Sequence, residues 1–221
     1  MANPHTQLKV PAAESPSAPA GIRTRVGSPY RGTAVIVGSL FVIQLITFAM
    51  GSSLIDTYLS GDADKPTLFA GVALEMCSGL AIAVIGLLMY RVLREVDPRW
   101  ALGYPILRLT EFAVSAVLAV YLVTQLQQFP HHLVWIYLPT GLGGLILNYL
   151  FFVSGLVPRV IAVLGLIGYG LLTLTVPLDL LGVIDVENGT GLLMLAPGGF
   201  YEFLVLPIWL FARGFRTPRR A

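Results

Sequence analysis

Residues 68–90 read LFAGVALEMCSGLAIAVIGLLMY, and this stretch decides the class of fold. It is as long as the roughly 20 apolar residues that an α-helix needs to cross a bilayer. Glu75 is the only charged residue in it. A segment of this length and character predicts a transmembrane helix.

Five other segments share the length and the apolar character of this stretch. They cover residues 33–55, 104–124, 133–153, 160–178 and 192–212. Over the whole chain of 221 residues, 56% are hydrophobic, 12% are charged and the mean hydropathy is +0.78. This composition is typical of polytopic membrane proteins. We therefore predict an all-α membrane domain over residues 31–215, a helical bundle of six transmembrane helices.

Proline residues predict irregularity in the last two segments. Pro177, Pro197 and Pro207 each lack a backbone N–H, and membrane helices tolerate such residues where neighbours satisfy the freed groups. We expect kinks in these helices, or a late start of the last one at Pro197.

The two ends of the chain differ from the apolar segments. Residues 1–30 are rich in Pro, Ala and Ser and predict a disordered tail. This tail does not resemble a signal peptide, because the first apolar run follows Arg23, Arg25 and Arg31. Residues 216–221 form a basic tail that we expect to contact anionic lipid.

Lys and Arg residues are distributed unevenly over the connections. Twelve of the fourteen lie in the two tails, in the second and fourth connections, or next to them. These twelve are Lys9, Arg23, Arg25, Arg31, Arg91, Arg94, Arg99, Arg159, Arg213, Arg216, Arg219 and Arg220. By the positive-inside rule, we expect both termini to be cytoplasmic, and we expect the protein to lie in the inner (plasma) membrane.

Four ionisable residues lie inside the apolar segments: Glu75, Arg108, Glu111 and Glu202. A charge at bilayer depth costs about 2.5–3.5 kcal/mol by insertion scales, so such side chains normally face the interior of the bundle. The three acids are candidates for a proton carrier or a general acid. Arg108 and the amide of Asn148 are candidates for binding a ligand.

Small residues share helix faces with two of these polar side chains. Glu75 follows Gly71 and precedes Gly79 at four-residue spacing, and Asn148 follows Gly144 in the same way. Small residues at this spacing permit close contact between membrane helices. We therefore expect both side chains to point toward protein, and for Asn148 a role in helix packing is the alternative to ligand binding.

The balance of charge inside the segments predicts pairing and protonation. Three carboxyl groups, those of Glu75, Glu111 and Glu202, share the single base Arg108. We predict that Arg108 pairs with Glu111 or another acid. Because burial disfavours charge, at least one remaining carboxyl should be protonated near neutral pH. A structural ion pair between Arg108 and Glu111 that fixes helix register is an equal alternative.

Several kinds of site have no support in the sequence. Cys77 is the only cysteine, and His131 and His132 have no acid near them in sequence, which predicts a solvated loop and no metal site. Motifs for nucleotide binding, zinc proteases and serine hydrolases are absent. We expect no cofactor, no metal and no nucleic-acid partner.

A set of short motifs resembles a known family. The motifs are Arg108-Leu-Thr-Glu111, Ser154-Gly155-Leu-Val-Pro158-Arg159, Gly165-Leu-Ile-Gly168-Tyr169, and Glu202 followed by Trp209-Leu210 and Gly214-Phe215. Together they resemble an uncharacterised family of bacterial six-span membrane proteins, classified only as a domain of unknown function. The resemblance covers roughly residues 31–215 and implies a fold and a membrane location, but no activity. Glu75 does not match its pattern.

Three classes of function follow from these residues. In the first, which we rank highest, the protein transports a small molecule with a proton carried by one of the acids, and Arg108 binds an anionic group or gates the path. In the second, a membrane-embedded enzyme of the terpene-cyclase kind, or a lipid-modifying one, uses a buried protonated Glu as general acid. The third is a non-catalytic accessory or sensing protein. Expected partners are membrane lipid and an apolar or anionic small molecule.

Overall fold

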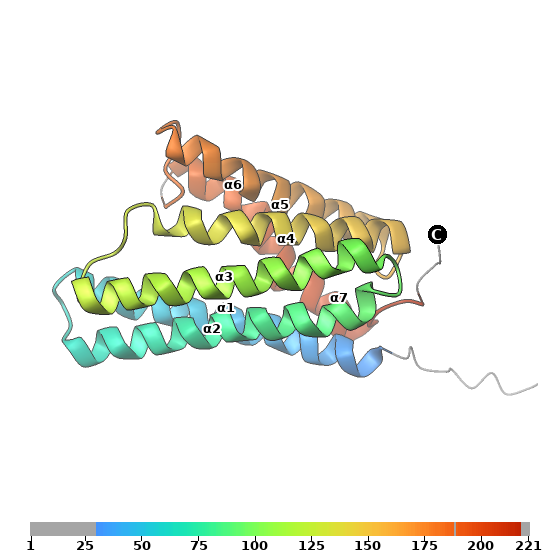
Figure 1. The fold of residues 1–221 in the computed structure, drawn as a ribbon, viewed down its shortest axis with the longest axis horizontal. Helices are drawn as coiled ribbons and strands as arrows, with labels where there is room; N and C mark the ends of the chain where they lie inside the picture. The colour runs from blue at the N-terminus through green and yellow to red at the C-terminus, as the bar shows by residue number, and fades with distance from the viewer. Residues whose placement is uncertain (1–29, 188, 218–221) are drawn as a thin grey trace, which may run out of the picture.

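Six helical passes make up the structure, a computed structural model that describes residues 30–187 and 189–217 (Figure 1). The elements are α1 Arg31–Leu59, α2 Lys65–Leu93, α3 Pro98–Gln125, α4 His132–Ser154, α5 Arg159–Leu180, α6 Gly189–Phe200, the π-helical turn η1 Tyr201–Val205 and α7 Leu206–Ala212. The last three elements form one pass. All six passes are long and apolar enough to cross a membrane, which confirms the predicted fold of a multi-pass membrane protein. The tail predicted for residues 1–30 lies almost wholly outside the described residues, as do residues 218–221 of the predicted basic tail.

Most helices begin or end beyond the predicted apolar segments, and α3 shows why. The apolar run starts at residue 104, but the helix begins at Pro98. The side chain of Asp97 accepts hydrogen bonds from the backbone N–H groups of Arg99 and Trp100, at 2.9 and 3.3 Å. A capping Asp followed by Pro in the first turn is a favourable helix start. The cap is polar, so hydropathy alone does not include it.

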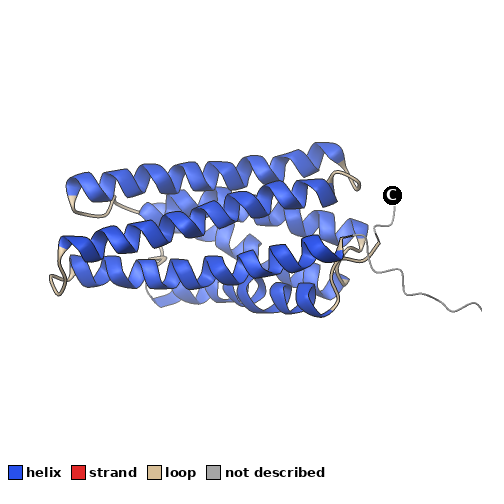
Figure 2. Ribbon diagram, turned by 90° about the horizontal axis from the view of Figure 1, so that it is seen from below, coloured by secondary structure: helices blue, strands red, loops and turns tan. Residues whose placement is uncertain are grey.

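Each helix packs against the next one along the chain, and the last pass closes the ring. The consecutive pairs from α1 to α6 are in contact, and α7 packs against α1 (Figures 1 and 2). Arg31 Nη2 donates a hydrogen bond to the carbonyl oxygen of Phe211 at 2.9 Å. Both ends of the described chain therefore lie at one end of the bundle, which we call the terminal end. The opposite end, formed by the α1–α2, α3–α4 and α5–α6 connections, is called the loop end.

Glycines allow the closest contacts between helices. A Cβ atom on Gly71 would lie 2.9 Å from the carbonyl oxygen of Gly51, so α1 and α2 meet there backbone to backbone. A Cβ atom on Gly168 would lie 2.7 Å from the Cα atom of Gly198, which marks a similar contact between α5 and α6. The contact at Gly71 agrees with the expectation drawn from its spacing to Glu75.

The last pass is broken next to Pro207, one of the prolines that predicted a kink, and not at Pro197. Pro197 lies inside α6, which already begins at Gly189, so a late helix start at Pro197 is wrong. The break is the π-helical turn η1, in which the N–H of Leu206 bonds to the carbonyl of Tyr201, five residues back. Pro207 follows directly and has no N–H to continue the α-helical pattern, which accounts for the irregular turn at this point. Glu202 lies within η1.

The half of the bundle toward the terminal end is filled by a large apolar core. Its fully buried side chains come from all six passes and include Phe41, Met89, Tyr104, Phe151 and Leu210. Close packing of these described side chains fills this half of the bundle. The space available for a site therefore lies in the other half, toward the loop end.

Candidate functional site

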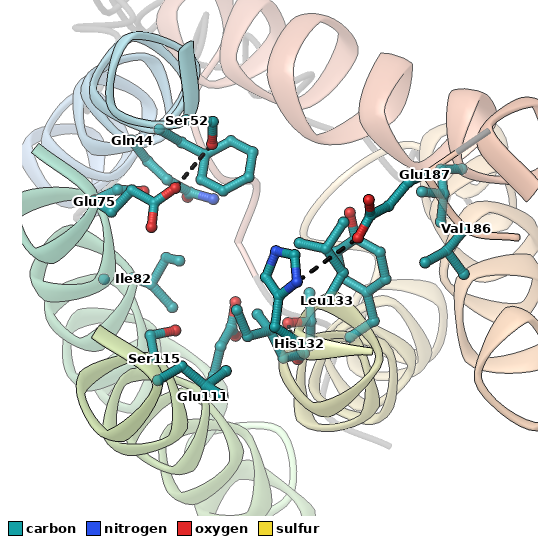
Figure 3. A pocket seen from close by; sticks show the side chains of 18 of the residues that line it. Gln44, Ser52, Glu75, Ile82, Glu111, Ser115, His132, Leu133, Val186 and Glu187 are labelled. Carbon is teal, nitrogen blue, oxygen red and sulfur yellow. Dashed lines mark hydrogen bonds and ion pairs between the residues drawn. The ribbon is translucent and has the colours of Figure 1, made fainter. Parts of the chain in front are cut away.

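A cavity of about 540 Å³ occupies the half of the bundle toward the loop end (Figure 3). Its wall on α1 runs from Gln44 to Asp56, which is about 18 Å at the helical rise of 1.5 Å per residue. Asp56, Phe129 and Glu187 are exposed and form the rim at the loop end. The volume lies in the range of small-molecule pockets.

The floor of the cavity is built around Arg108, of which only 1% is exposed. Its Nη1 atom lies 2.8 Å from Glu111 Oε2, and its Nη2 atom lies 3.6 Å from Glu202 Oε1. The predicted pairing of Arg108 with an acid is therefore confirmed, and the base is shared by two acids. Both carboxylates line the cavity, whereas Arg108 lies behind them.

Tyrosine side chains complete the shell of Arg108. Arg108 donates from Nε to the Tyr104 hydroxyl at 3.2 Å and from Nη2 to the Tyr169 hydroxyl at 3.4 Å. We call Arg108, Glu111, Glu202, Tyr104 and Tyr169 the Arg108 cluster. It brings together residues from α3, α5 and η1 and separates the cavity from the packed core of the terminal half.

Asn148 lies outside the cavity wall. It is fully buried, its Nδ2 donates to the carbonyl of Gly144 at 2.8 Å, and its Oδ1 accepts from the Tyr201 hydroxyl. A Cβ atom on Gly165 would overlap its amide, so Asn148 fills the space that this glycine leaves. Its contacts are those of a packing residue between α4, α5 and η1.

Glu75 lies on the wall formed by α1 and α2, apart from the Arg108 cluster (Figure 3). Its Oε1 accepts a hydrogen bond from Ser52 Oγ at 2.8 Å. Among the described residues no base forms an ion pair with it. All three acids predicted from the sequence thus face one cavity, at two separate places. The sequence did not decide whether they lie together or apart.

Two buried oxygen atoms at the floor have no hydrogen-bond donor within the described chain: Gln44 Oε1 and Glu202 Oε1. The residues are 7% and 6% exposed, and both line the cavity. The hydroxyl of Tyr169 and the amide of Gln44 also approach the Glu202 carboxylate. Gln44 was not among the residues predicted from the sequence. Its polar amide in the middle of the apolar segment 33–55 is the feature that would have pointed to it.

The wall combines acidic and apolar side chains. Its acids are Asp56, Glu75, Glu111, Glu187 and Glu202, and no Lys or Arg of the described chain lines the cavity. His132 is the only basic side chain among the described residues of the wall. The apolar part includes Phe48, Ile82, Leu118, Leu195 and Phe203. A cavity with this lining favours a ligand that carries positive charge and an apolar body.

The two histidines at the start of α4 each have an acidic partner in the structure. His131 Nδ1 lies 2.7 Å from Asp179 Oδ2, and His132 Nδ1 lies 3.6 Å from Glu187 Oε1. The side chain of His131 is 54% exposed, in keeping with the predicted solvated loop, whereas the two acidic partners were not predicted. Both acids are distant in sequence and reach the histidines only because α5 and the following loop pack beside the start of α4.

Replacing Asp179 with Ala should loosen the α5–α6 connection. Asp179 Oδ1 accepts from the backbone N–H of Val186 at 3.0 Å, and its other oxygen meets His131. Loss of a buried acceptor leaves the partner unsatisfied, which costs about 1–3 kcal/mol. We expect faster hydrogen exchange over residues 181–187, measured by mass spectrometry. Asp62→Ala, in the exposed α1–α2 turn, is the control, and equal exchange in both variants would contradict the prediction.

Comparisons with known proteins add a family and no activity. A family model described as "Domain of unknown function (DUF4386)" matches residues 32–128 and 115–214. No curated protein and no solved structure gives a significant match to the chain. The match covers all six passes.

Proposed function

This chain belongs to the DUF4386 family, a domain of unknown function, so we propose a role for it from the chemistry of its cavity. The proposed role is proton-linked transport of a small molecule. One observation carries the proposal. Glu202 lies on the π-helical break of the last pass and is paired with Arg108 at the floor of a cavity whose rim at the loop end is exposed. Interrupted helices that present polar groups to a central site are typical of secondary transporters, and π-turns often occur at functional sites.

The charges of the Arg108 cluster suit a proton carrier. With both acids ionised, two carboxylates and one guanidinium leave one net negative charge in a buried site. A proton on Glu202 would neutralise the cluster. Arg108 would keep its closer partner Glu111 at 2.8 Å, so no buried charge would be left unpaired. We therefore assign the carried proton to Glu202.

In this proposal Arg108 is part of a gate and does not bind an anionic substrate. Its guanidinium is already engaged by two carboxylates and two tyrosine hydroxyls, and it does not line the cavity. Neutralising Glu202 removes the ionic contact that holds η1 to α3. The last pass can then move about the break in η1 and the backbone contact between Gly168 and Gly198.

The direction of the cavity follows from the distribution of basic residues. The terminal end carries Arg31, Arg91, Arg94, Arg99, Arg159 and Arg213, and both ends of the described chain lie there. We place this end in the cytoplasm, with the protein in the inner (plasma) membrane. The mouth at the loop end then faces outward.

A membrane-embedded enzyme is the second candidate, and the aromatic wall is the observation that favours it. Phe48, Phe129, Tyr137 and Phe203 line the cavity, and Glu202 lies at its floor. A protonated Glu in such a site could act as a general acid on an apolar substrate. An enzyme of this kind does not need alternating access, so the two functions differ in whether the floor opens.

Alternating access can be tested without knowing the substrate. We would introduce Ser115→Cys in the cavity wall and Met89→Cys in the packed core, each with Cys77→Ser, and reconstitute the variants in oriented vesicles. A membrane-impermeant maleimide should label Ser115→Cys from the loop end and leave Met89→Cys unlabelled near neutral pH. Under mildly acidic conditions, labelling of Ser115→Cys should slow and Met89→Cys should react from the terminal end.

Glu202→Gln is the matched variant for this experiment. A Gln at this position cannot change its charge, so the labelling pattern should no longer depend on pH. Identical labelling at both pH values in the parent protein would contradict transport and favour the enzyme or an accessory role. Labelling from the loop end only would also confirm the placement of the mouth, once the orientation of the vesicles is fixed by protease digestion.

A further inference from the structure

We propose that the cavity binds an amphipathic organic cation, with a primary ammonium group at the floor between Gln44 and Glu202 and an apolar body along the wall. This inference deepens the proposed function by naming its class of substrate, and it rests on that function. It stands on three observations that are independent of each other: unsatisfied acceptors, the sign of the charges, and the apolar lining.

The unsatisfied acceptors indicate a donor that the protein itself does not supply. Gln44 Oε1 and Glu202 Oε1 are buried, line the cavity and accept no hydrogen bond in the described chain, and Glu202 Oε1 has only the longer ionic contact of 3.6 Å to Arg108 Nη2. Buried acceptors of this kind normally have a partner. The amide of Gln44 approaches Glu202. A carboxylate only accepts hydrogen bonds, so the NH₂ group of Gln44 must face Glu202. The Oε1 atom of Gln44 is then left for another donor. An ammonium group has three N–H donors and no acceptor, which suits both oxygens.

The sign of the charges on the wall favours a cation over an anion. Among the described residues, five acids line the cavity and no Lys or Arg does. Within the described part of the chain, no group of three His, Cys, Asp or Glu side chains could hold a metal ion. A positively charged organic molecule is therefore a better match to the site than a metal ion or a carboxylate ligand.

The remaining wall accounts for the apolar body of the ligand. Phe48 and Phe203 lie in the same cavity as Gln44 and Glu202, and aromatic faces attract cations as well as apolar groups. A second acid, Glu75, lies on the opposite part of the wall from His132 and could receive the head group on entry (Figure 3). The cavity of about 540 Å³ accommodates a molecule with one aromatic ring.

Binding of such a cation would compete with the proton. Either an ammonium group or a proton on Glu202 neutralises the single net negative charge of the Arg108 cluster. Occupation by one disfavours the other, which is the coupling that an exchanger of protons for cations requires. Under mildly acidic conditions, where Glu202 carries the proton, each ammonium bound should therefore release a proton from the site.

Benzylamine, which is protonated near neutral pH, is the probe for this site. Binding of radiolabelled benzylamine to the purified full chain in detergent should be saturable and should weaken under mildly acidic conditions. Gln44→Met should weaken binding about tenfold or more, the size expected when a hydrogen bond to a charged group is lost. Gln44 is not part of the Arg108 cluster, so this variant should fold normally, as checked by gel filtration. Glu202→Gln should weaken binding further.

Control ligands test whether the protein recognises the ammonium group or the apolar body of benzylamine. A control variant tests whether benzylamine binds in the cavity or on the protein surface. Glu95→Gln, in the α2–α3 connection outside the cavity, should bind benzylamine as the parent protein does. Benzyltrimethylammonium has no N–H donor and should compete weakly, and benzenesulfonate should not compete. Tighter binding of benzenesulfonate than of benzylamine, or unchanged binding in both cavity variants, would overturn the proposal.

A flux measurement distinguishes failure of this inference from failure of the transport function. Vesicles loaded with a pH dye are exposed to benzylamine, benzyl alcohol and benzenesulfonate, and protein-free vesicles correct for passive permeation. Specific binding of benzylamine without protein-dependent proton movement would support the site and contradict transport. Proton movement with benzenesulfonate alone would support transport and contradict the choice of a cation.

Discussion

Arg108→Leu is expected to destabilise the protein severely, because it leaves buried charge without a partner. The change removes the base that pairs with two buried carboxylates, Glu111 and Glu202, and the donor to the hydroxyls of Tyr104 and Tyr169. Removing one member of a buried ion pair costs about 3–5 kcal/mol, because the remaining charge is buried without compensation. Denaturation by SDS in mixed micelles, followed by circular dichroism, would measure this loss.

Two further variants test whether uncompensated charge is the cause. Arg108→Leu combined with Glu111→Gln and Glu202→Gln removes the charges together and should recover most of the stability. The deficit of the single variant should also shrink as the pH falls, because the two acids lose charge by protonation. A single variant as stable as the parent near neutral pH would contradict uncompensated buried charge as the cause.

Gly144→Ala is expected to have the second largest effect, through packing and not through charge. A Cβ atom on Gly144 would overlap the ring of Tyr169, which is almost fully buried and accepts a hydrogen bond from Arg108. Helices α4 and α5 must separate, or the ring must leave Arg108. Overpacking of this kind costs about 1–3 kcal/mol, occasionally more. Thermal unfolding in detergent would show it as a lower midpoint.

The neighbouring glycine provides the control for this prediction. A Cβ atom on Gly143 would meet the Cβ atom of Leu107 at 3.4 Å, an ordinary contact. Gly143→Ala should therefore be neutral or slightly stabilising, since Ala also lowers the conformational freedom of the unfolded chain. Equal midpoints for the two variants would show that the interface between α4 and α5 adjusts to an added methyl group.

The irregular last pass illustrates where sequence reasoning reached its limit. Pro197 and Pro207 both predicted a disturbance, because each lacks an N–H group. The structure accommodates Pro197 within α6 and breaks the pass just before Pro207, at the turn that holds Glu202. Which proline interrupts a helix depends on whether neighbouring helices leave room for its ring and satisfy the freed carbonyls, and this information is not local in the chain.

The sequence by itself determined the class of fold and the candidates for the site. Apolar segments such as 68–90 have one stable solution in a bilayer, because only a helix satisfies its own backbone groups there. Glu75, Arg108, Glu111 and Glu202 stand out from the same segments, since each would be costly in contact with lipid. The pairing of Arg108 with Glu111 also follows from local geometry, because residues three apart share a helix face.

Only the tertiary structure decided how these residues meet. Glu202 reaches Arg108, Ser52 reaches Glu75, and Asp179 reaches His131 across helices that are far apart in sequence. The cavity and its unsatisfied acceptor on Gln44 exist only because the passes close into a ring around them. Helical period and hydropathy fix which face of a helix is polar, whereas the partner of that face is fixed by the packing of all six passes together.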